Sequence, residues 1–455
     1  MSNFGLALRI YSKLLIVLAA VVLCSLPGPG EKVQASESLQ IDIYGPGQPR
    51  LHLLLAAPMP LESGQAESGE PEFVQQLQDK LRRNLGYLPF LRQMEQEEIL
   101  LESPFMQGVQ GEDIDFQPLR MSQTDLLLTI GWRQEQGDAI RVELRIFDVY
   151  ARELMVGRGY VLSSKEQVPE AGNRFSAEVM QELTGNSAFF RSRLAFVREA
   201  EGSKEVYTSS PQGDNPRQLS DFGQVCLSPY WSWDGSKLAF TLLGKERHEL
   251  IIWHADSGQS ESIPLPANTI ISPIYNPDGD LVISADPEGN PDIFVLDKEG
   301  RLDSKLVDSW AIDISPDFDS SGEKMVFVSS RLGNPHIFML DMEKDKVSRL
   351  SYEGSYNTNP SISPDGRFVA YSRQTEQGHK LILNDLENGK EKQLTQGEGN
   401  DEDPAWGPDS YFLAFASDRS GEYRLYVTTR HGDEPKEIPT GPGQATFPAW
   451  NPNPN

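Results

Sequence analysis

The chain has 455 residues, of which 38% are hydrophobic and 9% are aromatic. This length predicts more than one domain, and the hydrophobic content is ample for packed cores, which excludes a disordered chain. The formal net charge of −26 argues against nucleic acid and anionic lipid as partners, because an acidic field repels both. Such a charge favours basic partners, or simply solubility.

The first 35 residues have the pattern of an export signal. Arg9 and Lys13 precede an apolar run over 14–26, and Val33-Gln34-Ala35 forms a small-residue cleavage site. The apolar run is too short to span a bilayer comfortably. An uncleaved anchor and a lipoprotein signal at Cys24 remain alternatives, although Leu23 is larger than lipoprotein processing prefers. Export predicts that the mature chain resides in a bacterial periplasm.

Cleavage after residue 35 changes both the charge and the cysteine content. The removed segment carries a net charge of +2, which leaves about −28 on the mature chain. Of the two cysteines only Cys226 remains, so an internal disulfide is excluded and stability must come from packing.

Residues 36–191 predict a separate α/β domain, because their hydrophobic pattern mixes helical and strand periods. The segment 59–72 is rich in Gly, Pro, Ser and Glu and predicts a loop. The expected elements are strands at 41–44 and 51–56, a helix at 71–85, strands at 126–132, 140–150 and 153–162, and a closing helix at 171–183.

From residue 228 onward the sequence repeats the pattern SPYWSWDGSKLAF. One position of this pattern recurs as Trp231, Tyr275, Phe318, Ile362, Trp406 and Trp450, at steps of 44, 43, 44, 44 and 44 residues. A period of this length is typical of a β-propeller, in which each blade is a four-stranded sheet. An open two-sheet sandwich or a run of unrelated hairpins is the alternative.

Each repeat contains the parts of one blade. A turn such as Asp234-Gly235 follows the aromatic position, and a buried strand such as 238–240 follows the turn. A third strand, a hairpin and a last short strand complete the unit. The Asp-Gly pairs are turn residues, since they lack the alternating acidic ligands of a calcium loop.

The two ends of the repeat region predict how the ring closes. The last repeat stops at Trp450 without its own buried strand, whereas Leu194-Ala195-Phe196 lies 44 residues before 238–240 and lacks a preceding aromatic strand. Pairing of these two half-blades would remove exposed sheet edges. The sequence therefore predicts an all-β propeller of six blades over 192–455.

The sequence lacks the usual motifs of catalysis. It has no GxSxG nucleophile elbow, Walker loop, HExxH or CxxC pair, and its six histidines have no ligand spacing. Asp401-Glu402-Asp403 could bind a cation or pair carboxylates, but such a run is more often a solvated loop. We therefore expect no enzyme activity, no metal and no cofactor.

The residues just before each aromatic position lead into the innermost strands and should surround one mouth of the central channel. They are polar and differ between repeats, which a purely structural repeat does not require; loop drift is the alternative explanation. The candidate partner-binding residues are Ser228, Asn268, Thr269, Asp313, Asn357, Thr358, Asn359, Asp401, Glu402, Asp403, Thr446 and Phe447.

Five features occur together in this chain: the export signal, the small α/β domain, the junction ELTGNSAFFRSRLAFV, the SPxWSxDGxxLAF repeats with their TolB- or WD40-like spacing, and the ending GQATFPAWNP. In these features the chain resembles the TolB family of periplasmic propeller proteins of the Tol-Pal system. Departures are the segment 59–72, Ser410 in place of a repeat Gly, and Asp317-Phe318-Asp319 in the third repeat.

The resemblance implies a monomeric, non-enzymatic adaptor in outer-membrane integrity and cell division. It implies that the lipoprotein Pal binds at the propeller mouth and that the inner-membrane protein TolA binds the mature N-terminus, whose residues are Ser36, Glu37, Ser38, Leu39, Gln40, Ile41 and Asp42. Pal binding would shift the tail between a docked and a released state. An exported propeller that binds or hydrolyses a peptide or sugar is the alternative function, followed by a purely structural surface-layer element.

Overall fold

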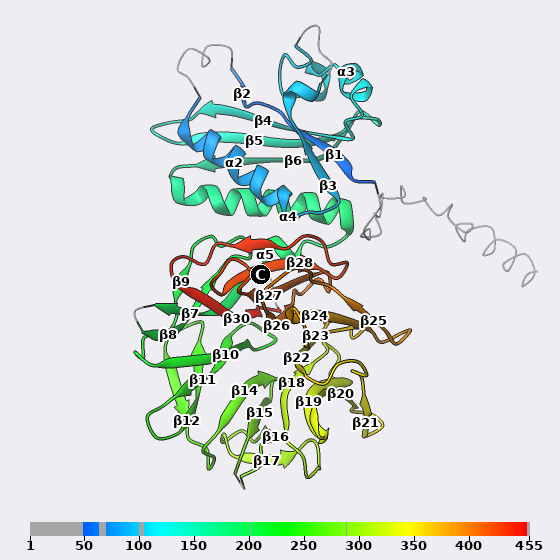
Figure 1. The fold of residues 1–455 in the computed structure, drawn as a ribbon. Coiled ribbons are helices and arrows are strands. Elements are labelled where there is room, and N and C mark those ends of the chain that lie inside the picture. Colours follow the sequence, from blue (N-terminus) through cyan, green and yellow to red (C-terminus); the bar gives the residue numbers. More distant parts are fainter. Residues whose placement is uncertain (1–48, 63–69, 100–103, 201, 288, 453–455) are drawn as a thin grey trace, which may run out of the picture. The chain divides into compact units, whose positions relative to one another are not determined.

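The computed structural model describes residues 49–62, 70–99, 104–200, 202–287 and 289–452 (Figure 1). The predicted export signal at 1–35, the predicted strand at 41–44 and the candidate tail at 36–42 lie outside these ranges. Within them, the helices are all too short or too polar to cross a membrane.

The residues before 192 form a mixed sheet with helices, as the sequence predicts. The sheet order is β3-β1-β4-β5-β6; β1 pairs in parallel with β3 and β4, and β4, β5 and β6 pair antiparallel. The short strand β2 pairs with β4 inside the segment predicted to be a loop. The elements are β1 (Leu51–Leu55), β2 (Met59–Pro60), α2 (Glu72–Gly86), β3 (Leu91–Met94), α3 (Phe116–Met121), β4 (Leu126–Gln134), β5 (Ile140–Asp148), β6 (Glu153–Leu162), α4 (Val168–Thr184) and α5 (Ala188–Arg191), with 3-10 turns at Gln96–Glu98, Gly111–Asp113 and Lys165–Gln167.

The two long helices follow from their hydrophobic spacing. On α2, Val74, Leu77 and Leu81 recur every three or four residues and are fully buried, which places one apolar stripe against the sheet. The helix α4 ends at Gly185, which adopts the left-handed conformation that closes a helix without a Cβ clash. The predicted helices at 71–85 and 171–183 correspond to α2 and α4, whereas β3 and α3 were not predicted.

The repeat region consists of short strands arranged around a common centre (Figure 1). The strands are β7 (Leu194–Ala200), β8 (Ser203–Ser209), β9 (Arg217–Gln218), β10 (Val225–Trp231), β11 (Lys237–Leu243), β12 (His248–His254), β13 (Ser260–Ile263), β14 (Ile270–Tyr275), β15 (Leu281–Ala285), β16 (Asp292–Leu296), β17 (Leu302–Lys305), β18 (Asp313–Phe318), β19 (Lys324–Leu332), β20 (Asn334–Asp341), β21 (Lys346–Arg349), β22 (Asn357–Ile362), β23 (Phe368–Thr375), β24 (Gly378–Asp385), β25 (Lys390–Gln393), β26 (Asp401–Trp406), β27 (Phe412–Ser417), β28 (Arg424–Thr429), β29 (Lys436–Ile438) and β30 (Gln444–Trp450).

In the described part of the repeat region, these strands form four separate four-stranded sheets and one eight-stranded sheet. The four sheets are each antiparallel and follow the chain order, for example β18-β19-β20-β21. The eight-stranded sheet contains β10 to β13 and β30 with β7 to β9, and a single parallel pair, Val225 with Lys204, joins these halves. The predicted β-propeller is confirmed, with four blades present as separate four-stranded sheets.

The two ends of the repeat region pair with each other. Strand β30 lies antiparallel to β7, with Trp450 opposite Leu194 and Gln444 opposite Glu199. The predicted closure between the residues near 194 and the end of the chain is therefore present. It removes two edges that would otherwise be exposed.

Neighbouring sheets pack face to face through their middle strands. Between two of the sheets, Ala370, Leu381 and Leu383 on one side contact Leu413 and Phe415 on the other within one buried cluster. Each buried apolar run predicted from the repeat is thus a strand covered on both faces. Since four such buried clusters each span two neighbouring sheets, the ring is the unit of stability.

Candidate binding site at the central channel of the propeller

One dipeptide recurs in every strand that surrounds the centre of the propeller. It ends in proline and lies three residues before each repeated aromatic position; its first residues are Ser228, Ser272, Ser315, Asn359, Asp403 and Phe447. All six first residues have a left-handed backbone, with φ between 48° and 56°. Residues other than glycine rarely adopt this backbone conformation, and each residue that does so costs on the order of 1–3 kcal/mol.

The strand geometry explains why proline and a strained residue occur together. The inner strands β14, β18, β22 and β26 are each the edge strand of their sheet, so a missing N–H breaks no pairing on that side. All six inner strands show a register shift at the dipeptide, for example between Ile314 and Asp317. A bulge of this kind turns the strand and redirects its side chains, here toward the channel.

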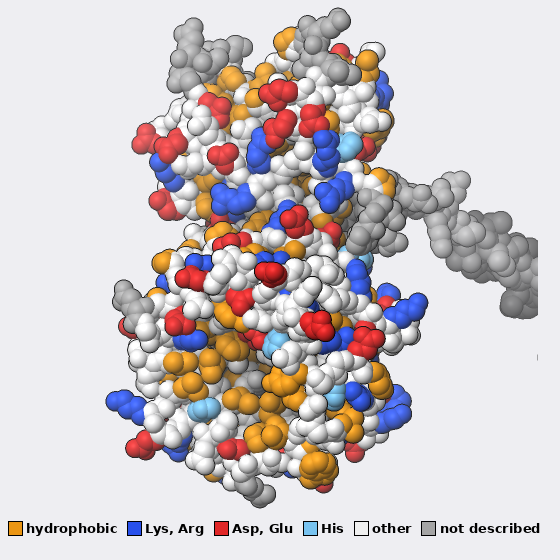
Figure 2. All heavy atoms as spheres, viewed as in Figure 1, with side chains coloured by type: hydrophobic (Ala, Val, Ile, Leu, Met, Phe, Trp, Pro, Cys, Tyr) orange, Lys and Arg blue, Asp and Glu red, His pale blue; other side chains and the backbone are white. Residues whose placement is uncertain are grey.

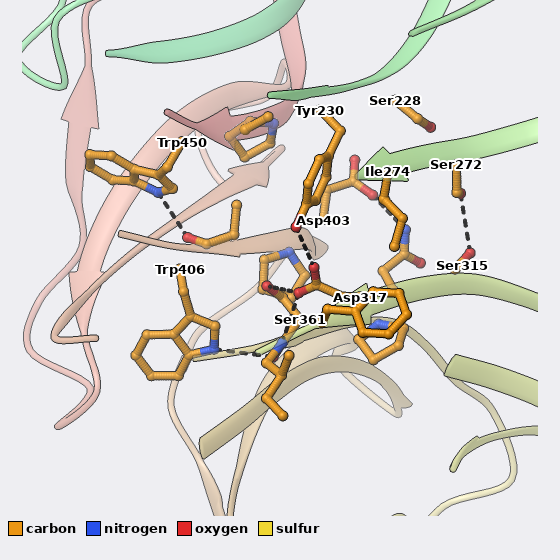
Figure 3. A pocket seen from close by; sticks show the side chains of 18 of the residues that line it. Ser228, Tyr230, Ser272, Ile274, Ser315, Asp317, Ser361, Asp403, Trp406 and Trp450 are labelled. Carbon is orange, nitrogen blue, oxygen red and sulfur yellow. Dashed lines mark hydrogen bonds between the residues drawn. The ribbon is translucent and has the colours of Figure 1, made fainter. Parts of the chain in front are cut away.

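The six dipeptides line a cavity of about 170 Å³ at the centre of the ring. Its wall also contains Tyr230, Trp233, Asp317, Trp406 and Trp450 (Figure 3). Hydrophobic side chains gather around the hollow at the centre of the propeller in Figure 2. The wall is therefore mostly proline and aromatic, with two carboxyl groups, Asp317 and Asp403, among the lining residues.

Asp317 is held by hydrogen bonds from two other inner strands of the ring, β10 and β22 (Figure 3). Tyr230 Oη donates to Asp317 Oδ1 over 2.9 Å, and Ser361 Oγ and the Ile362 backbone N–H donate to Oδ2, each over 2.9 Å. Burial raises the pKa of Asp317 to about 6, and these three donors limit the rise. The carboxyl group thereby ties three blades' inner strands together.

Asp403 is the second carboxyl group of the wall. Asn359 Nδ2 donates to its Oδ1 over 2.7 Å. Burial, followed by the nearby charge of Glu402, raises the pKa of Asp403 to about 7, and the Phe447 backbone N–H partly offsets the rise. This group therefore changes its charge near neutral pH.

Three indole side chains each donate a hydrogen bond to a carbonyl group of a neighbouring inner strand. Trp450 Nε1 donates to the Ala405 carbonyl over 2.9 Å, and Trp406 Nε1 donates to the Ser361 carbonyl over 3.1 Å. Trp233 Nε1 donates to the Tyr275 carbonyl over 2.9 Å. At the repeated aromatic positions 406 and 450 the indole thus joins two inner strands, so these two side chains are structural.

We call the end of the channel at which the inner strands begin the N-face and the other end the C-face. Three of the predicted partner-binding residues, Asp313, Asn357 and Asp401, begin their strands at the N-face but have fully buried side chains. Asp313 pairs with Arg331 over 3.2 Å, and Asp401 pairs with Arg419 over 2.7 Å. Such residues hold the rim together.

Asn357 has the same role in the fourth repeat. Arg373 Nε donates to its Oδ1 over 3.0 Å, and its Nδ2 donates to the Glu353 carbonyl over 3.2 Å. Its side chain also contacts His336. Asn357 is thus satisfied within the protein, as a buried polar side chain should be.

The structure places the other candidates in two groups. Ser228, Asn359, Asp403 and Phe447 line the cavity. Asn268, Thr269, Thr358, Glu402 and Thr446 lie at the N-face with at least partly exposed side chains. Of these, Glu402 accepts a bond from Tyr423 and contacts His379 Nδ1 over 2.6 Å.

Several lining residues were absent from the predicted set, among them Ser272, Ser315, Tyr230 and Asp317. The constant distance between the proline dipeptide and the aromatic position could have identified the two serines. Asp401-Glu402-Asp403 begins β26 instead of forming a solvated loop. In the described ranges, no cluster of His, Cys, Asp or Glu has the arrangement of a metal site.

Comparison with known proteins gives three findings. Residues 180–454 match the family model described as the TolB beta propeller domain. The Tol-Pal system protein TolB of Nitratidesulfovibrio vulgaris is 39% identical over 314 residues, which cover 69% of each chain, and that of Desulfosudis oleivorans is 34% identical over 212 residues, 46% of this chain and 48% of the relative. The crystal structure of TolB from Acinetobacter baumannii aligns with a TM-score of 0.74 at 21% identity, covering 90% of this chain and 98% of that one.

The closed ring of sheets with its lined channel defines a β-propeller protein that carries an α/β domain. The matched propeller model and the 39% identical relative make the family clear. The chain belongs to the TolB family, whose members are non-enzymatic components of the Tol-Pal system.

Proposed function

We propose that this chain is a periplasmic adaptor of the Tol-Pal system that binds Pal at the N-face of its propeller and TolA through its mature N-terminus. In this role it would support outer-membrane integrity and cell division. The observation that carries the Pal site is the N-face rim, where exposed polar residues differ from one repeat to the next while the buried ones are internally paired.

We further propose a ring of six blades and the division 1–35, 36–191 and 192–455 for signal, α/β domain and propeller. Support for six blades comes from the eight-stranded sheet, whose two halves each contain four strands and share only the pair Val225 with Lys204. The six bulged inner strands give the same number for the described residues.

The Pal site would use the exposed part of the rim. Asn268 and Thr269 lie just before β14, and Thr358, Glu402 and Thr446 each directly precede the proline dipeptide of three other inner strands. Ser228, Asn359, Asp403 and Phe447 would form the floor of the site, because they line the cavity. Asp313, Asn357 and Asp401 would support it from within.

A substitution at the rim tests the Pal site. Asn268→Arg places a long cationic side chain at the N-face and should weaken binding of the soluble Pal domain at least tenfold, by steric and charge mismatch. Gln259→Arg makes the same change at an exposed hairpin on the C-face, between β12 and β13, and should leave the affinity within twofold. Equal affinities of both variants in calorimetric titration would reject the N-face as the Pal site.

Deletion tests the TolA site. Removal of residues 36–42 from the mature chain should abolish TolA binding and leave the propeller folded, because the ring closes through β7 and β30. Unchanged TolA affinity would reject the role of the tail. If Pal binding shifts the tail between its docked and released states, Pal changes the affinity for TolA, and TolA changes the affinity for Pal by the same factor.

A further inference from the structure

The propeller exposes large hydrophobic side chains in a narrow part of the chain. Among its described residues, these side chains are Trp310, Ile312, Leu332, Met342, Tyr352 and Tyr356. Trp310 is 78% exposed and Tyr352 is 71% exposed, which is unusual for aromatic side chains in a protein whose other blades bury theirs. Clustered exposed apolar side chains mark interaction surfaces, whereas scattered single ones need no explanation.

Five of the six lie at the N-face, four of them on loops and Leu332 at the end of β19. Asp313 pairs with Ser329 and Asn357 pairs with Arg373, so the loops that precede β18 and β22 lie at the same end as the hairpins that follow β19 and β23. We call the loops 308–312, 330–334, 351–356 and 374–378 the aromatic sector. Met342 lies at the C-face, because its N–H donates to the Glu323 carbonyl at the start of β19.

Hydrogen bonds hold the four loops of the aromatic sector together. The backbone and hydroxyl group of Ser330 bond with the backbone of Ile312, over 3.0 Å in each case. The Gln374 N–H donates to the Tyr356 carbonyl over 2.9 Å. His336, which follows the first hairpin, contacts Asn357 Nδ2 over 3.2 Å. The exposed side chains are therefore presented on an ordered base.

Polar neighbours contact the two residues that carry the most exposed rings. The Arg349 guanidinium lies 5.2 Å from the centre of the Tyr352 ring, and Asn290 Nδ2 donates to the Trp310 carbonyl over 2.9 Å. Neither contact covers the outer face of the ring, as the exposure shows. Rigid, amphipathic rings lose little conformational freedom on binding, which is why Trp and Tyr dominate interface hot spots.

The charges of the aromatic sector are mostly acidic. Its charged side chains are Asp308, Arg331, Glu353 and Glu376. Arg331 is paired with the buried carboxylate of Asp313, and Arg373, which contacts Glu353, already pairs with Glu391 over 2.5 Å. Even with the Arg349 cation beside Tyr352, acidic side chains outnumber basic ones, so the exposed rim of the aromatic sector carries net negative charge.

This charge selects among possible occupants. An anionic membrane surface and a second copy of the same acidic patch would both be repelled. The candidate tail at 36–42 contains Glu37 and Asp42 and no basic residue, so it would be repelled too. A protein surface that combines an apolar centre with lysine or arginine at its rim matches both features of the patch.

We propose that the aromatic sector is an off-centre anchor for a protein partner with an apolar contact surface and a basic rim. The inference rests on the proposed function, in which that partner is Pal. The partner then sits over the channel mouth with most of its binding free energy concentrated on the side of β18 and β22, chiefly at Trp310 and Tyr352. The polar rim elsewhere sets its orientation.

The double variant Trp310→Ala/Tyr352→Ala tests the anchor. Both side chains are exposed, so the fold should be retained, as circular dichroism and thermal unfolding will show. We expect the affinity for the soluble Pal domain to fall at least thirtyfold in calorimetric titration, because truncation of a hot-spot aromatic residue costs more than tenfold alone. Met342→Ala removes an exposed apolar side chain of the same sheet at the C-face and should change the affinity less than twofold.

The outcomes distinguish the anchor in the aromatic sector from the proposed Pal site on the N-face. If the double variant binds Pal like the parent protein while Asn268→Arg abolishes binding, the anchor is wrong and the N-face site stands. If the parent protein does not bind Pal, both the proposed function and the proposed anchor are rejected. If the parent protein binds vesicles of phosphatidylglycerol and the double variant does not, the patch is a membrane contact, and the assignment to a protein partner is overturned.

Discussion

The channel wall and the aromatic sector arise from the repeat in opposite ways. The wall is built from one dipeptide copied six times, with the same strained backbone and the same bulge in each copy. The aromatic sector uses residues on loops of only two repeats, at positions where the other repeats expose no large apolar side chain among the described residues. Repeated positions thus hold the ring together, and recognition is assigned to positions that break the repeat.

The largest expected effect concerns a buried member of the rim. Asp401→Ala should lower the free energy of unfolding by about 3–5 kcal/mol, because it leaves the Arg419 and buried Lys380 cations without their carboxylate. Chemical denaturation with urea measures this loss. A loss of this size would show that Asp401, a predicted partner-binding residue, stabilises the ring as the repeated positions of the channel wall do.

An exposed acid of the aromatic sector provides the matched control. Glu376→Ala should change the free energy of unfolding by less than about 0.5 kcal/mol. If Asp401→Ala costs no more than this control, the buried ion pairs of the rim do not support the ring, and the division between the two regions fails.

The next effect concerns pH. Burial raises the pKa of Asp403 to about 7, well above its ordinary value. At pH 5 the folded protein therefore holds a proton that the unfolded chain has lost, so this group makes the free energy of unfolding fall as the pH rises from about 4 to about 7. Asp403→Asn lacks this titration and should gain about 2 kcal/mol relative to the parent protein between pH 5 and pH 8.

A carboxyl group with the opposite shift serves as control. Hydrogen bonds from Ser232 and Ser236 lower the pKa of Asp234, so its contribution is lost only at more acidic pH. The difference between Asp234→Asn and the parent protein should stay constant between pH 5 and pH 8. A constant difference for Asp403→Asn as well would mean that the channel wall does not bury this carboxyl group.

The smallest effect concerns the strained backbone of the wall. Ser228→Gly should raise the free energy of unfolding by about 0.5 kcal/mol, because glycine removes the cost of a left-handed residue while adding freedom to the unfolded chain. Gly213→Ala should act in the opposite direction, since its Cβ would lie 2.2 Å from the Pro439 carbonyl oxygen. A loss of stability in Ser228→Gly would show that the serine is needed at the bulge.

Much of the fold follows from spacing alone. The 44-residue period locates every inner strand, and the unmatched strand at 194–196 locates the closure, because both depend only on where apolar residues recur. Strand β3 and helix α3 escaped prediction because they are short, with 4 and 6 residues, and too few turns or alternations occur to establish a period.

The site was less accessible to prediction, for two physical reasons. Asp313, Asn357 and Asp401 resemble exposed loop residues in sequence, but arginines sixteen or eighteen positions later bury and neutralise them or satisfy them by hydrogen bonds. Trp310 and Tyr352 are indistinguishable in sequence from core aromatic residues, since exposure depends on how four loops meet. The separation of supporting from binding residues therefore required the structure.

Site-specific photo-cross-linking tests the central claim most directly, because it reports which face of the propeller contacts Pal. A photoreactive phenylalanine analogue would replace Tyr352 on the N-face in one variant and Met342 on the C-face in another, and each protein would be irradiated with the soluble Pal domain. If Pal binds the N-face, a covalent product with Pal forms from position 352 and none forms from position 342. A product from position 342, with none from position 352, would contradict binding at the N-face.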